Sequence, residues 1–294
     1  MTPLPFLLIG ISAFVHAGWN LLAHSRRSDA TLFLRATIVT GIIGILPALA
    51  AEWLGPAFPL QVWGLLALTG IFQALYYLGL TMGYRSGDFT VIYPLARALP
   101  VLFLAFIDMA RGRMPAPLGW LGMGLVFAGC AMVPLESLRV VSFARYRNRA
   151  FIWVLVTALG TVGYTTIDKI AAEALPPGPA SAARYAIFEA IASIPYLWLA
   201  LRLAGERISA AHGIREWRWA AFAGVFITGA YFLVLWAYQL SPFASYISAL
   251  RQFSIVIGVA AAALLFHEPA RGLRIGAALV IAVGIVCITI AAAS

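Results

Sequence analysis

Residues 70–99 read GIFQALYYLGLTMGYRSGDFTVIYPLARAL, and residues 224–253 read GVFITGAYFLVLWAYQLSPFASYISALRQF. The two stretches align without a gap at a constant offset of 154 residues. Chance matches between apolar segments are common, but matched Arg and Tyr residues at one gapless offset indicate an internal repeat. The identical pairs include Gly70/Gly224, Phe72/Phe226, Tyr77/Tyr231, Tyr84/Tyr238, Phe89/Phe243 and Arg97/Arg251, and the offset continues through Pro115/Pro269 and Gly122/Gly276.

Each copy of the repeat contains five apolar segments. A bilayer core about 30 Å thick needs roughly 20 apolar residues per helix, and an odd number of spans inverts the second copy relative to the first. The sequence therefore predicts an all-α integral membrane protein with ten transmembrane helices in two inverted five-helix repeats, 1–135 and 150–294, joined by a basic connector at 136–149. The ten predicted spans are 4–23, 30–50, 62–83, 89–109, 117–134, 150–169, 181–203, 218–239, 243–265 and 272–291.

The composition supports a multi-pass membrane protein rather than a soluble one. Hydrophobic residues make up 63% of the 294 residues and charged residues only 11%, whereas soluble domains carry about 25% charged residues. The net charge of +9 comes mostly from Arg in short loops beside apolar spans, which is the composition of cytoplasmic membrane edges. We therefore expect the lipid bilayer as the surroundings and no nucleic-acid partner.

The basic residues also predict the orientation of the chain. The end of the bundle that is rich in Arg should face the cytoplasm, which would place both termini outside. The opposite end has only Arg111, Arg113 and Lys169. The Arg-rich end has Arg26, Arg27, Arg85, Arg139, Arg145, Arg147, Arg149, Arg202, Arg207, Arg215, Arg218, Arg271 and Arg274.

Two arginines lie deep inside predicted spans, at equivalent positions of the two repeats. An Arg at the bilayer centre costs at least about 2.5–3.5 kcal/mol, and its guanidinium cannot lose its proton to escape that cost. Arg97 and Arg251 can form a two-armed clamp for an anion, since the planar fork binds carboxylate or phosphate through two hydrogen bonds. Alternatively, each pairs with Glu189, Asp108 or the backbone and locks the bundle.

Glu189, in the seventh span, is the most central carboxylate of the sequence. Burial favours the protonated form of a carboxyl group and a nearby Arg favours the ionised form, so Glu189 is the candidate for proton coupling. The alternative is a permanent ion pair with Arg184, Arg97 or Arg251. Asp168 and Lys169 are interpreted as a pair at the end of the sixth span, and His267–Glu268 as a cytoplasmic turn.

The first span contains polar residues in the stretch SAFVHAGWNLLAH, 12–24. His16, Trp19 and Asn20 share one helix face, which either lines a wet cavity or binds a neighbouring helix closely beside Gly18. Tyr77 and Tyr231 match across the repeat in mid-span. The predicted substrate-binding residues are Arg97, Arg251, His16, Trp19, Asn20, Tyr77, Tyr93, Tyr231 and Gln252.

Three features give the chain a resemblance to a known family: the paired five-helix repeat, HAGWN at 16–20, and SALRQFSIVIG at 248–258 with LLFHEPARGLRIGAALVIAVGIV at 264–286. With these, the whole chain resembles the EamA family of the drug/metabolite transporter superfamily, although Met114 stands where the second repeat has Glu268. The resemblance implies a secondary transporter, in most cases an exporter of amino acids, other metabolites or drugs. It also implies cytoplasmic termini, opposite to the charge pattern.

Together these patterns predict a transporter in a bacterial inner membrane that exports a small anionic or zwitterionic metabolite by alternating access, driven by protons or by exchange. Efflux of apolar cationic drugs and flipping of a lipid-linked phosphate are the alternatives. The chain lacks a G-x-x-x-x-G-K-[ST] loop, an H-E-x-x-H motif and clustered Cys and His, so we expect neither ATP drive, a metal nor another cofactor. It shows no clustered nucleophile and base, so we do not expect an enzyme. The sequence gives no indication of the oligomeric state.

Overall fold

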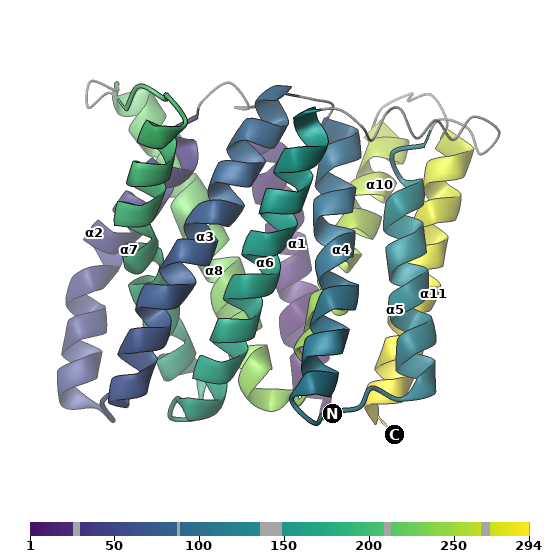
Figure 1. Cartoon of the computed structure of the whole chain (residues 1–294), viewed down its shortest axis with the longest axis horizontal. Coiled ribbons are helices and arrows are strands. Elements are labelled where there is room, and N and C mark those ends of the chain that lie inside the picture. Colours follow the sequence, from purple (N-terminus) through teal and green to yellow (C-terminus); the bar gives the residue numbers. More distant parts are fainter. Residues whose placement is uncertain (26–29, 87–88, 136–148, 209–212, 266–270, 294) are drawn as a thin grey trace.

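The computed structural model describes residues 1–25, 30–86, 89–135, 149–208, 213–265 and 271–293. In this part of the chain all regular secondary structure is α-helical, and the helices run side by side as a bundle (Figure 1). The elements are α1 (Pro3–Ser25), α2 (Leu32–Leu54), α3 (Leu60–Ser86), α4 (Phe89–Ala110), α5 (Pro117–Met132), α6 (Arg149–Ala174), α7 (Pro179–Leu203), α8 (Ile214–Leu240), α9 (Ala244–Leu250), α10 (Phe253–Leu265) and α11 (Arg271–Ala293).

The helices account for the ten predicted spans with one correction. The ninth span was expected as one helix over 243–265, but it consists of α9 and α10, with Arg251 and Gln252 between them. Hydropathy cannot reveal this interruption, because the apolar residues continue on both sides of it. The sixth span is also longer than predicted, since α6 extends to Ala174. The predicted connector at 136–149 lies outside the described residues except for Arg149.

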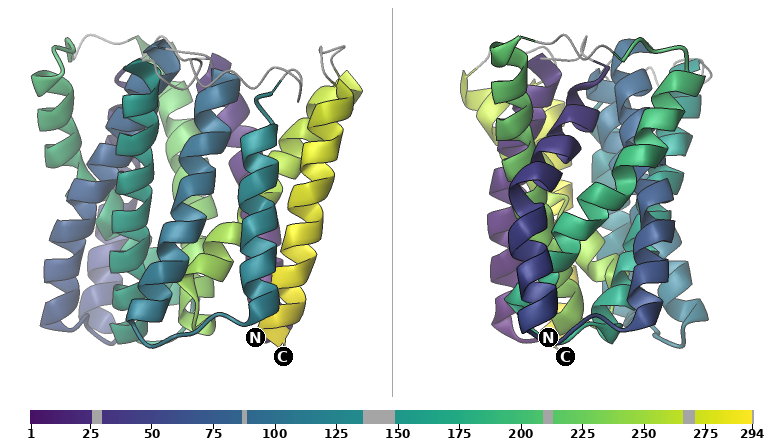
Figure 2. Two further views of the ribbon diagram at one scale, coloured as in Figure 1. Left: turned by 45° about the vertical axis from the view of Figure 1, so that its right-hand side comes forward. Right: turned by 90° about the vertical axis from the view of Figure 1, so that its left-hand side faces the viewer.

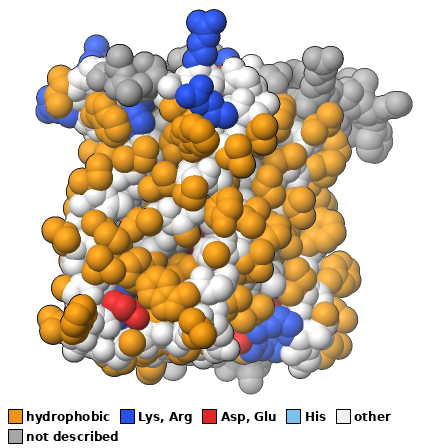
Figure 3. Space-filling view, turned by 60° about the vertical axis from the view of Figure 1, so that its left-hand side comes forward, with side chains coloured by type: hydrophobic (Ala, Val, Ile, Leu, Met, Phe, Trp, Pro, Cys, Tyr) orange, Lys and Arg blue, Asp and Glu red, His pale blue; other side chains and the backbone are white. Residues whose placement is uncertain are grey.

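The surface of the bundle is that of a membrane protein. Large apolar side chains such as Leu46, Trp53 and Leu60 are 75%, 89% and 87% exposed, which in water would create an aggregating surface. On the face in Figure 3 they cover the middle, and Lys and Arg gather toward the two ends. In the described chain α2, α3, α6, α7, α8 and α11 are long and apolar enough to cross a bilayer, and α1, α5 and α9–α10 contain shorter apolar stretches.

The packing of helices from the two halves is reciprocal. The first helix of one half packs on the third of the other, as α1 on α8 and α6 on α3. Helices α2 and α7 pack together at one edge of the bundle, and α5 and α11 at the other (Figure 1). Both termini lie at the same end (Figure 2), where the Met1 amino group donates to the Ala292 carbonyl.

Two glycines matched in the sequence repeat bring helices of the two halves into close contact. A Cβ added at Gly70 of α3 would lie 2.7 Å from the Ala192 carbonyl oxygen of α7, and one at Gly224 of α8 would lie 2.6 Å from the Ala36 carbonyl oxygen of α2. Neither position can therefore carry a side chain without moving a helix. Small residues at contacts are the usual means of tight packing in membranes.

Candidate functional site

At the interruption of the ninth span the backbone hydrogen bonds change from those of an α-helix to those of tighter turns, since the Ser254 N–H donates to the Arg251 carbonyl (3.2 Å) and the Ile255 N–H to the Gln252 carbonyl (2.8 Å). At the break the Gln252 N–H donates to the Ala249 carbonyl (3.0 Å) in a tighter turn than that of an α-helix. The Arg251 carbonyl accepts from Ser254 Oγ at 3.0 Å and from Arg97 Nη2 at 3.3 Å. Irregular backbone at membrane depth occurs where protein or a water-filled cavity surrounds it, and discontinuous helices form the substrate sites of many transporters.

Arg97, in the continuous helix α4, uses its guanidinium to bind the protein itself. Its Nε donates to Gln252 Oε1 at 2.9 Å, its Nη1 donates to His16 Nε2, and its Nη2 reaches the Arg251 carbonyl. Gln252 completes the contact, since its Nε2 donates to the carbonyls of Ser248 (2.9 Å) and Arg97 (3.3 Å). Arg97 therefore fastens α4 and α1 to the break.

Arg251 is placed differently, although its sequence position is equivalent. Its guanidinium carbon lies 5.4 Å from the centre of the Tyr231 ring, within the range of a cation–π contact. Among the described residues, no carboxylate lies within ion-pair distance of the Arg251 guanidinium. Arg251 is also one of the residues that line a cavity, and a guanidinium at such a place suits a carboxylate because its planar fork can donate two hydrogen bonds.

This cavity lies between helices of both halves and contains both charged and aromatic groups. The volume of the cavity that the centres of water molecules can occupy is about 40 Å³. This is enough for a few waters but not for a metabolite. A substrate therefore needs the walls to move apart. The lining comprises His16, Gln73, Tyr76, Tyr77, Tyr164, Ala186, Glu189, Ala190, Ser193, Ile227, Thr228, Tyr231 and Arg251.

Tyrosine rings form a continuous wall of the cavity. The rings of Tyr77 and Tyr76 lie 5.2 Å apart, those of Tyr76 and Tyr164 5.5 Å apart, and those of Tyr164 and Tyr231 5.6 Å apart. The first two rings come from α3, the others from α6 and α8. Such a wall can contact an apolar group or, through the ring faces, a cation.

A buried carboxyl cluster lies beside the cavity. Glu189, 1% exposed, accepts a hydrogen bond from Gln73 Nε2. Asp168, fully buried, accepts from Thr69 Oγ1 at 2.7 Å, from the Tyr185 hydroxyl at 2.9 Å and from the Tyr231 hydroxyl. The interpretation of Asp168 and Lys169 as a helix-end pair is thus wrong, because successive residues of α6 point in different directions.

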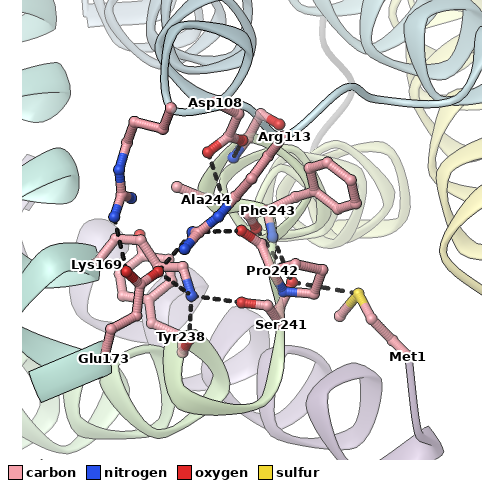
Figure 4. A network of polar contacts seen from close by, with 12 residues as sticks. Met1, Asp108, Arg113, Lys169, Glu173, Tyr238, Ser241, Pro242, Phe243 and Ala244 are labelled. Atoms are coloured by element: carbon pink, nitrogen blue, oxygen red, sulfur yellow. Dashed lines mark hydrogen bonds and ion pairs between the residues drawn. The ribbon is translucent and has the colours of Figure 1, made fainter. Parts of the chain in front are cut away.

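Lys169 belongs to a separate network at the terminus-bearing end of the bundle (Figure 4). Its Nζ donates to the carbonyls of Tyr238 (2.7 Å) and Ser241 (2.5 Å) and lies 3.0 Å from Glu173. Glu173 also pairs with Arg111 at 2.7 Å and Arg113 at 2.5 Å. We call Arg111, Arg113, Lys169 and Glu173 the terminus-side network; it joins α6 to the connections between α4 and α5 and between α8 and α9.

Asp108, at the end of α4, binds the start of α9. Its carboxylate accepts from the backbone N–H groups of Ser245 (2.9 Å) and Ala244 (3.3 Å). A carboxylate at a helix N-terminus satisfies donors that the helix cannot pair itself. Asp108 therefore attaches a helix of the second half to the first half, and among the described residues it forms no ion pair with either intramembrane Arg.

The structure brings five of the residues singled out in the sequence together at the cavity: His16, Tyr77, Glu189, Tyr231 and Arg251. Arg97 and Gln252 lie behind this wall, bound to each other. The alternative partner Arg184 pairs with Glu52 at 3.2 Å instead of Glu189. The side chains of Trp19, Asn20 and Tyr93 and the whole of His267–Glu268 lie outside the described part of the chain.

Sequence reasoning missed three polar residues of the lining and the importance of Asp168. Gln73, Ser193 and Thr228 are single polar residues in apolar spans, a pattern that also fits helix contacts. The one available signal for Gln73 was its place one turn before Tyr76 and Tyr77, on the same helix face. No three His, Cys, Asp or Glu residues of the described chain form a group that could hold a metal ion.

Comparison with solved structures supports the fold. One crystal structure, described only as that of a protein, matches with a TM-score of 0.64 at 14% sequence identity, covering 99% of this chain and 99% of its own. At this identity the likeness concerns the fold alone. No curated protein matches the sequence significantly.

The sequence comparison identifies the family. Residues 148–290, which contain α6 to α11 with the interrupted span, Glu189 and Arg251, match the EamA-like transporter family. The all-helical bundle, the apolar surface and this match agree in describing a multi-pass membrane transporter. Over residues 148–290, just under half of its length, the chain is similar to the EamA-like transporter family.

Proposed function

We propose that the protein is a secondary transporter that exports a small zwitterionic metabolite, with a carboxylate and an ammonium group as in an amino acid. The observation that carries the proposal is the presence of Arg251 and Glu189 in the lining of one cavity. One fixed cation and one carboxyl group suit a ligand with both charges. Arg97 donates to Gln252 and His16, so the structure favours a single Arg at the substrate over the two-armed anion clamp.

In the proposed complex the substrate carboxylate accepts two hydrogen bonds from the guanidinium of Arg251. Its ammonium group faces Glu189, and its side chain lies on the rings of Tyr76, Tyr77 and Tyr164. Aromatic faces accept apolar groups and attract cations. The predicted contacts of Trp19, Asn20 and Tyr93 with the substrate remain part of this proposal.

We propose alternating access between two inverted repeats as the mechanism. Two observations support a two-fold relation between the halves. Helix α1 packs on α8 as α6 packs on α3, and Gly70 and Gly224 make equivalent close contacts with the opposite half. The cavity lies between the halves, where such a transporter binds its substrate. A rocking motion would widen it and open it to one side at a time.

The proposed orientation follows the positive-inside rule. The helix ends that carry Arg85, Arg202 and Arg215 lie opposite the end with the termini and the terminus-side network. In a bacterial inner membrane the terminus-side network would then lie toward the outside. On α6 the ion-paired residues Lys169 and Glu173 lie about one and a half and two and a half turns beyond Tyr164 of the cavity, so export requires the ion pairs to separate.

A charge series of otherwise similar compounds tests the proposal. Proteoliposomes are assayed for uptake of phenylalanine, phenylpropionate and phenylethylamine, which share a ring but differ in charge. We expect transport of phenylalanine and at least a tenfold preference over the other two, equal to about 1.4 kcal/mol. Transport of phenylethylamine alone would favour efflux of apolar cations. Lipid scrambling without uptake of any of the three would favour the flipping of a lipid-linked phosphate.

A further inference from the structure

The carboxyl cluster beside the cavity contains two acids of opposite character. Asp168 has the environment of an ionised carboxylate, because the three hydroxyl groups of Thr69, Tyr185 and Tyr231 donate to it. Donors to a carboxylate stabilise its negative charge. Asp168 does not line the cavity and is fully buried, so its charge is held inside the bundle.

Glu189 has too few donors for an ionised group. Gln73 Nε2 binds its Oε1, but the other carboxyl oxygen is buried and has no hydrogen-bond donor among the described residues. The Gln73 side-chain oxygen is also buried and without a donor. A buried acceptor without a donor costs about 1–3 kcal/mol, and more when it is charged. The cluster therefore lacks a hydrogen atom.

The hydrogen-bond donors place Asp168 and Glu189 next to each other. Thr69, which donates to Asp168, lies one turn before Gln73, which donates to Glu189, on the same face of α3. Tyr185, which also donates to Asp168, lies one turn before Glu189 on α7. Two ionised carboxylates cannot form a hydrogen bond, because neither has a hydrogen to donate. Two neighbouring carboxylates in a buried site also repel strongly, so such pairs ionise one at a time. One proton on Glu189 removes the repulsion and supplies the missing donor.

We propose that Asp168 and Glu189 together form a binding site for one proton, which Glu189 holds and donates to Asp168 in a hydrogen bond. The site itself stands on the geometry of the cluster; its use in driving export rests on the proposed function. Asp168 is a positioning residue, and Glu189, which lines the cavity, exchanges the proton with it.

In the transport step the O–H bond of Glu189 breaks and the proton passes to water in the cavity. The electron pair stays on the Glu189 carboxylate, whose negative charge the ammonium group of the substrate then balances. Tyr231 links this event to the other end of the substrate, because its hydroxyl binds Asp168 and its ring lies under Arg251. The other titratable or charged groups that face the pair are Tyr76 and Tyr77 from α3, Tyr164 from α6, Tyr185 from α7, Tyr238 from α8, Arg251 and, from α1, His16.

Infrared spectroscopy of the purified full-length protein without substrate tests the site. We expect one carbonyl-stretch band of a protonated carboxyl group at neutral pH, shifted in D₂O. Glu189→Gln should abolish the band, because it removes the group that carries the proton. Asp168→Asn should also abolish it, because Glu189 then faces an amide donor and Arg251 without a neighbouring carboxylate. The matched control is Glu206→Gln, which removes an acid near the opposite end of the bundle that pairs with Arg85 and should leave the band unchanged.

A gentler variant covers the case in which the acid variants do not fold. Thr69→Val keeps both carboxyl groups and nearly the same shape but removes one donor to Asp168. The band should then persist to a pH about one unit higher than in the unaltered protein. The absence of a band in the unaltered protein, its survival in folded Asp168→Asn, or an unmoved pH in Thr69→Val would each overturn the shared-proton site. None of these results depends on transport. The uptake assay with the three compounds of different charge therefore tests the proposed function independently.

Discussion

The two arginines of the sequence repeat occupy equivalent positions but have different surroundings. Arg97 lies in the uninterrupted helix α4, and its guanidinium donates to Gln252, His16 and the Arg251 carbonyl. Arg251 lies where the ninth span is interrupted, lines the cavity and contacts the Tyr231 ring. A repeated sequence therefore does not imply a repeated role, because a local break in one helix is enough to redirect the side chain.

The difference indicates how such a protein pays the cost of two charges inside a membrane. In this structure Arg97 is compensated by acceptors of the protein itself. Its contacts also support the break itself, since its Nη2 donates to the Arg251 carbonyl there. In our proposal Arg251 is fully compensated only when substrate is bound. An arginine of the first half thus supports the break at which the second half presents Arg251.

Replacing Arg97 should have the largest effect, and the effect should be on stability. Arg97→Leu leaves the Gln252 side-chain oxygen and the Arg251 carbonyl with one donor fewer each, and we expect a loss of about 3 kcal/mol in the free energy of unfolding. Thermal unfolding in detergent measures it, with Arg85→Lys as a control at an exposed position. A stable Arg97→Leu variant with lost substrate affinity would instead restore the two-armed anion clamp.

Replacing Arg251 should affect binding more than stability. Arg251→Lys keeps the positive charge but removes the planar fork, so we expect the affinity for a transported zwitterion to fall about tenfold, or about 1.4 kcal/mol. Isothermal titration with the best substrate of the charge series gives the affinity, and the melting temperature should change less than in Arg97→Leu. An unchanged affinity would remove Arg251 from the substrate site.

The smallest expected effect is a difference in stability between phenylalanine variants of the two matched tyrosines, Tyr231 and Tyr77. Tyr231→Phe removes the hydroxyl that binds Asp168 but keeps the ring beneath Arg251, and we expect a loss of about 1 kcal/mol of stability. Tyr77→Phe should cost less, because the Tyr77 ring stacks on Phe33 at 5.1 Å and its hydroxyl has no hydrogen bond to a described residue. Equal melting temperatures of the two variants would show that the bond to Asp168 adds no stability.

The sequence was a good guide to the spans, since length and hydropathy decide whether a helix can cross a bilayer. It did not reveal the break at Arg251. No Gly or Pro marks the stretch SALRQFS, 248–254, and the break is held by tertiary contacts from Arg97 and Ser254. Such contacts have no local signature in the sequence.

The most conspicuous residues of the sequence do line the candidate cavity. Charged groups and matched tyrosines in mid-span are costly in lipid, and His16, Glu189 and Arg251 stood out for that reason. Asp168 did not, because its sequence neighbour Lys169 offered a simpler partner. Its true partners come from α3, α7 and α8, and single-sequence reasoning cannot foresee which helices meet.

The terminus-side network contains Lys169, and the 294 residues include no other lysine. Lys169 is 2% exposed, and its amine binds two carbonyl oxygens and Glu173. Amine-reactive reagents therefore have a single internal target, protected as long as the network is intact. In the proposed export cycle this end of the bundle opens, so covalent modification of this one side-chain nitrogen would report that the network has separated, with no residue introduced for the purpose.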